Sequence, residues 1–249
     1  MKVKLISMTP KPIDVMWTAA RTCYSSQSPI GMWEDRYDLE PGWAISEKEY
    51  NKYQEKMWKL VQQVLNSGHQ SIAESVYFTF AVEGVTRACM AQITRHRAGI
   101  VFSVQSQRYV NLKDGFNYET PQSIKSDVEL QGDFEELMGS IYSFYKKAIE
   151  KNIKLEDARA VLPNACTTNI TFSVNYRELM HLCNLRLCQR AQTEIRNLFK
   201  EIVKEVKAQD VRLAQYLVPQ CEVNGFCKEH SCCGRKPTLK KIKETSAVK

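Results

Sequence analysis

One stretch, Arg95 to Tyr109, constrains the fold more than any other part of the chain. It begins with Arg-His-Arg, continues through the apolar run Ile-Val-Phe and ends with Ser-Gln-Arg-Tyr. Each guanidinium carries five donors and keeps its charge, so the natural complement is an anionic oxygen, and phosphate fits the fork geometry. An arginine-rich surface turn is the simpler alternative. However, the apolar run predicts that the stretch returns to the core and holds its polar ends in fixed places.

Size and composition are those of an ordinary globular protein. The chain has 249 residues, of which 43% are hydrophobic and 25% charged, enough for one large domain or two small ones. No apolar run approaches the roughly 18–20 residues of a membrane span, and the N-terminus has too little apolar length for a signal peptide. We therefore expect a cytoplasmic protein without membrane contact.

The positive charge lies mostly in the tail. The net charge is +7, and one Arg, five Lys and one Glu in residues 235–249 contribute +5 of it, which leaves about +2 for the body. A body so weakly charged argues against a nucleic-acid-binding surface. The alternative in that class is a module that places the Arg-His-Arg turn and the Lys-rich tail on phosphates.

Hydrophobic periodicity predicts one α+β domain. Alternation predicts strands over residues 1–7, 76–82, 101–110 and 168–174. Helical spacing predicts helices over 14–22, 46–68, 85–97 and 133–149, a short one near 156–159, and a long helical region from 176 to about 209. Ser46-x-x-Glu49 has the form of a capping box, and Asn175-x-x-Glu178 that of a cap. We expect a single domain over residues 1–220, followed by a Cys- and Lys-rich tail over 221–249. Within the domain we expect a loop or insertion at 25–45 and a polar loop at 113–132.

Three further segments of the sequence carry polar residues that could contact a ligand. The first is Gly-His-Gln-Ser-Ile-Ala-Glu at 68–74, the second is Glu-Asp-Ala-Arg-Ala-Val-Leu-Pro at 156–163, and the third runs from Asn175 to Arg186. Each also has a plain structural explanation. A loop histidine is more often solvated than catalytic, Glu156 and Arg159 could form an intrahelical pair, and Arg190 could pair with Glu194 on an exposed helix.

Together with Arg95–Tyr109, these segments resemble in order the signature of the flavin-dependent thymidylate synthases. The resemblance runs from about residue 19 to 195 and implies a thymidylate synthase-complementing-like fold, with a mostly antiparallel sheet flanked by long helices. It implies a methyltransferase that converts dUMP to dTMP. Methylenetetrahydrofolate would supply the carbon, and FAD reduced by NADPH would supply the hydride. It also implies a homotetramer whose sites are shared between subunits.

The same resemblance assigns roles to individual residues. Arg186 would stabilise charge on the uracil ring, and His69 would lie near the flavin and folate. The implied FAD contacts are Ser71, Arg95, His96, Arg97, Asn175, Arg177 and His181. The implied dUMP contacts are Gln92, Arg95, Gln105, Ser106, Gln107, Arg108, Arg159 and Arg186. Ser106 is expected to bind rather than to attack, because no sequence-adjacent base activates it. The spacer from Ala98 to Gln105 is one residue longer than the shortest form of the signature, so the register of these residues stays open.

The tail cysteines leave an alternative open. Cys221, Cys227, Cys232 and Cys233, with His230, are dense enough for zinc, but their spacing differs from paired Cys-x-x-Cys sites. We therefore expect reduced thiols and no metal. The chain also lacks Gly-x-Gly-x-x-Gly and Walker-type sequences, so a bound dinucleotide would be held by side chains.

Overall fold

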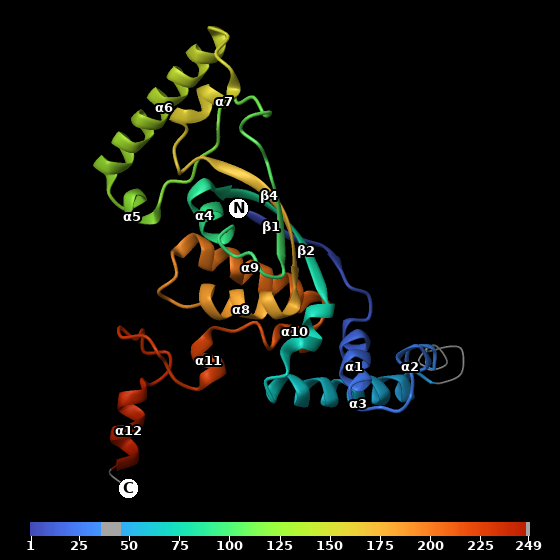
Figure 1. The fold of residues 1–249 in the computed structure, drawn as a ribbon. Helices are drawn as coiled ribbons and strands as arrows, with labels where there is room; N and C mark the ends of the chain where they lie inside the picture. Colours follow the sequence, from blue (N-terminus) through green and yellow to red (C-terminus); the bar gives the residue numbers. More distant parts are fainter. Residues whose placement is uncertain (36–45, 248–249) are drawn as a thin grey trace.

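The computed structural model describes residues 1–35 and 46–247. It confirms the α+β class with an antiparallel sheet of four strands in the order β1-β2-β4-β3 (Figure 1). The strands are β1 (Lys2–Met8), β2 (Tyr77–Thr86), β3 (Ile100–Val104) and β4 (Thr167–Asn175). The chain therefore brings the segment after the Arg-His-Arg triplet beside the strand that leads into Asn175.

One face of the sheet forms the core. Phe78 and Phe80 of β2 alternate with less buried neighbours, as do Phe172 and Val174 of β4. These side chains pack against α8 (Tyr176–Arg186) and α9 (Thr193–Gln209), which lie on that side of the sheet (Figure 1). The opposite face keeps Val101 and Tyr77 exposed. Among the described residues of one chain, therefore, the sheet is covered on one face only.

The other helices surround this two-layer body. Those before β3 are α1 (Pro12–Thr22), α2 (Pro29–Glu34), α3 (Glu47–Asn66), the 3-10 helix η2 (Gln70–Ser75) and α4 (Arg87–Ile93). Those between β3 and β4 are α5 (Gln122–Lys125), α6 (Val128–Glu150), α7 (Leu155–Ala158) and the 3-10 helix η3 (Arg159–Val161). The last are α10 (Val211–Ala214), α11 (Gln220–Asn224) and α12 (Leu239–Ala247). No helix in the described ranges is both long enough and apolar enough to cross a bilayer.

Two sequence-based caps are confirmed. Ser46 and Glu49 form the reciprocal capping box at the start of α3. Asn175 caps α8 by accepting a hydrogen bond at 2.8 Å from the Glu178 N–H. In both places the polar side chain satisfies a backbone donor that has no partner within the helix.

The predicted helix over 85–97 is wrong at both ends. β2 continues to Thr86, because Val85 and Thr86 still pair with β4 beyond a bulge that contains Gly84 at φ 73°. Thr86 then caps α4 by accepting from the Cys89 N–H at 3.0 Å. The helix ends at Ile93, so the Arg-His-Arg triplet lies in the following turn and not in a helix.

Other predicted boundaries also move. The strand expected to reach residue 110 ends at Val104, because Ser106 starts a turn in which its carbonyl accepts from the Val110 N–H. The long helix begins at Val128 rather than at 133, capped by Asp127. The expected loop at 113–132 contains α5 and this first turn. The region 176–209 is two helices separated by residues 187–192. The 25–45 segment contains α2, and its residues 36–45 lie outside the described part.

Candidate active site

His96 is the centre of a half-buried polar cluster between the turn after α4 and helix α8. Its Nε2 lies 2.8 Å from an Arg186 terminal nitrogen, and its Nδ1 lies 3.5 Å from a Glu178 carboxylate oxygen. A guanidinium can only donate, so Nε2 accepts and the ring proton sits on Nδ1, facing Glu178. Glu178, His96 and Arg186 thus form a chain of contacts that orients the guanidinium.

The charge surrounding His96 keeps its ring neutral. Burial, and then the nearby Arg186, His181 and Arg95, together lower the pKa of His96 to about 4. Burial likewise raises the pKa of the Glu178 carboxyl above its usual range. The cluster therefore presents a neutral acceptor to Arg186 rather than a second cation.

Arg186 has more donors than this chain satisfies. The nitrogen that meets His96 also donates to the Gln92 carbonyl at 3.3 Å, while Nε is buried without an acceptor among the described residues. Burial and then Arg95 lower the pKa of the guanidinium from its usual value. A buried cation with an unsatisfied donor is costly unless a ligand supplies the acceptor.

Asn175 and Gly99 fix the position of the triplet. Gly99 adopts φ 65°, and its carbonyl accepts from the Asn175 N–H at 2.8 Å. A Cβ on Gly99 would stand 2.4 Å from the Asn175 side-chain nitrogen. Only glycine fits this left-handed position against a buried neighbour. Asn175 is thus buried as a helix cap and a packing partner for Gly99, a structural task that the sequence shows only in part.

The second half of the signature lies in a separate place, beyond the other end of β3. Ser106 Oγ accepts from the Arg108 N–H at 3.1 Å, and the Arg108 guanidinium pairs with Glu156 at 2.8 Å. Arg159 turns its Nε to the Glu156 carbonyl at 3.3 Å, and Gln107 approaches the Cys166 sulfur at 3.8 Å. The Glu156 carboxylate therefore pairs with Arg108 instead of Arg159, while the Glu156 carbonyl accepts from Arg159. Glu156 thus brings the Ser106–Arg108 segment and Arg159 together.

Strand β3 separates the two halves. Ile100 at its start pairs with Val174, and Val104 at its end pairs with Ile170. Its 5 residues span about 16 Å at the rise of an extended strand. Gln105 follows at the far end and its N–H donates to the Asn169 carbonyl at 2.9 Å. A single chain thus places the Arg95–Arg97 and Ser106–Arg108 groups at opposite ends of the strand.

A third group lies on the exposed side of η2. Arg177 of α8 pairs with Glu74 in a short contact, and both side chains are about half exposed. His69 and Ser71 are exposed at the start of the same 3-10 helix. This group shares α8 with the His96 cluster, since η2 packs on α8.

Acidic partners are the residues that sequence reasoning missed. Glu178 meets His96, Glu156 meets Arg108, and Glu74 meets Arg177. All three stood in the quoted segments as caps or helix-face residues, so their presence was visible but their partners were not. The alternative pair between Arg190 and Glu194 does not form, because Arg190 pairs with Glu229 at 2.7 Å and Glu194 accepts from Thr86 Oγ1 at 2.6 Å.

Three residues of the His96 cluster are of types that can bind a metal ion. Ligand atoms of His96, Glu178 and His181 all lie within 4.8 Å of one another. Arg186, however, occupies Nε2 of His96, and the cationic Arg95 stands close enough to lower the pKa of that ring. Such surroundings disfavour a cation and favour an anionic ligand.

The chain is similar to known proteins over most of its length. Residues 4–210 match the family model described as "Thymidylate synthase complementing protein". A flavin-dependent thymidylate synthase of Clostridium tetani is 40% identical over 97% of this chain and 96% of its own length. One from Geobacter sulfurreducens is 36% identical, with 97% of each chain covered. One from Pyrococcus furiosus is 36% identical over 92% of this chain and 89% of its own.

A solved structure shares the fold. The crystal structure of the flavin-dependent thymidylate synthase ThyX from Helicobacter pylori, complexed with FAD and dUMP, matches with a TM-score of 0.62 at 22% identity. The match covers 88% of this chain and 100% of that one. At this identity the match supports the fold alone.

Proposed function

The chain belongs to the thymidylate synthase complementing protein family, and we infer that it is a flavin-dependent thymidylate synthase. It is a methyltransferase that converts dUMP to dTMP with FAD as its cofactor. Methylenetetrahydrofolate as the carbon donor and NADPH as the reductant complete the proposal.

The observation that carries this proposal is the unsatisfied guanidinium of Arg186, with the exposed Arg95 nearby. Among the described residues, Arg95, Arg97 and Arg186 make no ion pair, and Arg186 buries a donor that lacks an acceptor. Anionic and carbonyl-rich ligands such as dUMP and the FAD pyrophosphate suit these donors. When bound, FAD supplies the hydride chemistry that no side chain can perform.

The residues near Arg186 have tasks that follow from their contacts. Glu178 holds the proton on His96 Nδ1, and His96 Nε2 in turn holds one edge of the Arg186 guanidinium. The guanidinium would stabilise negative charge on the uracil ring as carbon 5 becomes a nucleophile. Because its orientation is set before the ligand arrives, little reorganisation is needed.

The remaining predicted residues are proposed as binding groups. Arg95, His96 and Arg97 would border the flavin, together with Ser71, Asn175, Arg177 and His181, and His69 would approach the flavin and folate. Gln92, Gln105, Ser106, Gln107, Arg108 and Arg159 would hold dUMP, most directly through the last two guanidinium groups. For Asn175, the burial supports a contact made through the loop it positions rather than through its own amide.

We further infer that each site combines two or more chains of a homotetramer. The basis is the separation along β3, which places the Arg95–Arg97 and Ser106–Arg108 groups at opposite ends of a strand of about 16 Å. The open sheet face and the exposed apolar residues of α6, such as Leu137 and Phe144, offer surface for such contacts.

The central test is Arg186→Ala. We expect dTMP formation from dUMP, methylenetetrahydrofolate and NADPH to fall by about 100- to 1,000-fold, the usual loss for one transition-state donor. The flavin absorbance of the purified protein should persist, because other residues hold FAD. Lys59→Ala, which removes an exposed cation on α3, is the control and should keep full activity. A fully active Arg186→Ala enzyme would refute the role, and a wild-type protein that takes up no FAD would refute the function.

Subunit mixing tests the shared site separately. Arg186→Ala and the double variant Arg108→Ala/Arg159→Ala are each impaired at low dUMP. If the two groups belong to one site from different chains, mixed oligomers regain activity, since some sites then hold neither change. A mixture that stays as inactive as its components, with exchange confirmed by mass spectrometry, would place both groups in one chain.

A further inference from the structure

The segment after α10 folds without a hydrophobic core of its own. Over residues 220–243 the only buried side chain is that of Cys227. Its regular structure is the short α11, part of α12 and one isolated bridge between Cys227 and Thr238. So small a lobe buries too little apolar surface to hold one conformation, and lobes of this kind usually need a metal or covalent cross-link.

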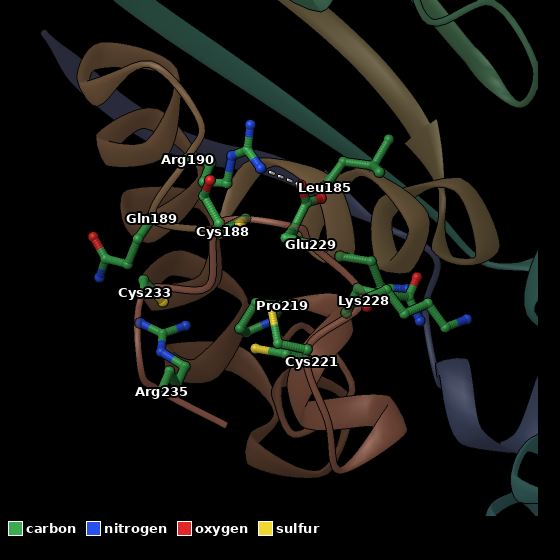
Figure 2. A pocket seen from close by; sticks show the side chains of 14 residues that line it. Leu185, Cys188, Gln189, Arg190, Pro219, Cys221, Lys228, Glu229, Cys233 and Arg235 are labelled. Carbon is green, nitrogen blue, oxygen red and sulfur yellow. Dashed lines mark hydrogen bonds and ion pairs between the residues drawn. The ribbon is translucent and has the colours of Figure 1, made fainter. Parts of the chain in front are cut away.

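Cysteines gather where such a cross-link would act. A cavity of ≈ 190 Å³ lies between this lobe and the connection from α8 to α9, and its lining includes Cys188, Cys221, Cys227 and Cys233. Figure 2 shows Cys221 on the lobe side and Cys188 on the body side of this cavity. Cysteines from three separate segments thus face one space.

A backbone N–H points at one of these sulfurs. Gly234, at φ 87°, directs its N–H to the Cys232 sulfur at 3.3 Å, and the Cys232 thiol donates to the Lys236 carbonyl at 3.2 Å. Cys227 is hydrogen-bonded to Cys232, and Cys221 lies near Cys227. A tight glycine turn whose N–H points at sulfur suits a metal-bound thiolate.

We propose that Cys188, Cys221, Cys227 and Cys232 bind one structural zinc ion that ties the C-terminal lobe to the body. On binding, each of the four thiols releases its proton to solvent and forms a bond to Zn²⁺, with no change in oxidation state. The tetrathiolate carries two net negative charges, and Arg190, Lys228 and Arg235, which line the same cavity, compensate them. Adjacent cysteines seldom occupy two corners of one tetrahedron, so only one of Cys232 and Cys233 is a ligand. Cys233 lines the cavity, but Cys232 is chosen because it is hydrogen-bonded to Cys227.

The lobe must contract for this geometry to form. Within the described residues, the cysteine sulfurs form no set of three that all lie within 4.8 Å of one another. Zinc holds its sulfur ligands at about 2.3 Å. Because the lobe has no packed core to resist movement, closure over the ion is inexpensive. The proposal replaces the sequence-based expectation of reduced thiols without metal, and it does not depend on the proposed enzymatic function.

Metal analysis of the full-length protein is the test. We expect about one zinc ion per chain after purification without chelator, and Co²⁺ substitution should give the sulfur-to-metal charge-transfer band of a tetrathiolate site. Cys227→Ser/Cys232→Ser should reduce the zinc content to a few per cent of that value. The control Cys23→Ser should keep it, because Cys23 is an exposed cysteine that follows α1 and lies outside the lobe.

If the double variant misfolds, a measurement on the wild-type protein can still test the proposal. Cysteine alkylation followed by mass spectrometry should show the four proposed ligands protected in the native protein and labelled after chelation. Zinc that is absent from metal-replete protein, or that survives in the double variant, would overturn the proposal. So would a Cys227–Cys232 disulfide in the freshly isolated chain, or labelling of these cysteines that chelation does not change.

Discussion

The two halves of the signature, Arg95–Gly99 before β3 and Ser106–Tyr109 after it, are held in different ways. The first half is fixed by this chain's own interior, through Gly99 against the buried Asn175 and His96 against Arg186. The second half is a turn whose main side-chain anchor is the partly exposed ion pair between Arg108 and Glu156. The first half is thus held by contacts with buried or half-buried residues, and the second by a contact at the protein surface.

This difference separates two ways of preparing a ligand site. Near Arg186 one buried donor has no acceptor among the described residues, which is unfavourable in the free protein. In return, the guanidinium is oriented before a ligand binds. Around Arg108 the cost is low, because an exposed ion pair contributes roughly 0–1 kcal/mol and rearranges readily. Changes in the first half should therefore affect stability and turnover together, while changes in the second should affect substrate binding alone.

The largest expected effect on stability is that of Gly99→Ala. The new Cβ would meet the Asn175 amide at 2.4 Å, and the backbone at φ 65° disfavours any side chain. We expect a loss of about 2–4 kcal/mol in the free energy of unfolding, from strain and overpacking combined. Chemical denaturation followed by circular dichroism measures it.

Gly132→Ala is the matched control. Gly132 lies within α6, and a Cβ there meets nothing within 4 Å. Alanine in a helix interior should stabilise the protein by up to about 1 kcal/mol. If both variants kept wild-type stability, the first half would not be fixed by Gly99 and Asn175, and the contrast between the halves would fail.

The sequence predicts the local part of this picture and misses the long-range part. Alternation locates β2 and β4, and the capping patterns locate the starts of α3 and α8, because each depends on neighbouring residues. The start of α4 depends on Thr86, whose pairing with Thr167 extends β2. No local pattern reveals that pairing. The family signature proposes the residues of the site, and it does so without their geometry.

In the C-terminal tail, the sequence also misses a long-range feature, here a group of cysteines that only the fold brings together. Spacing alone argues against zinc, since it compares only cysteines that are close in sequence. Cys188 joins the others only through folding, which brings the connection after α8 to the cavity beside α11. The acidic partners of the arginines are hidden for the same reason.

The pH dependence of stability tests how deeply the first half is buried. The pKa of His96 is about 4 in the folded protein, below the 6.5 of an unfolded chain. The unfolded state thus binds more protons between these values, so the His96 contribution is fully present above pH 6.5 and is lost as the pH falls toward 4. Between pH 7 and pH 5 this loss is about 2 kcal/mol.

The measurement compares wild type with His96→Gln by denaturant titration at both pH values. The variant should lack this pH-dependent loss, while the other titrating groups, including Glu178, affect both proteins in the same direction. Equal pH slopes for the two proteins would mean that His96 is solvated and does not accept from a fixed Arg186.

The smallest effect is expected in the second half, from Arg108→Ala. The variant removes one charged contact to dUMP under the proposed function, so the KM for dUMP should rise about tenfold, which corresponds to about 1.4 kcal/mol. Turnover at saturating dUMP should change little, and the unfolding free energy should fall by less than about 0.5 kcal/mol, because the ion pair with Glu156 is exposed. Lys113→Ala removes the same charge from the following loop and should leave the KM for dUMP unchanged. Steady-state kinetics and denaturation of both variants give the comparison. A large fall in turnover or stability for Arg108→Ala would show that this half is as firmly built into the fold as the first, and that the distinction drawn along β3 does not hold.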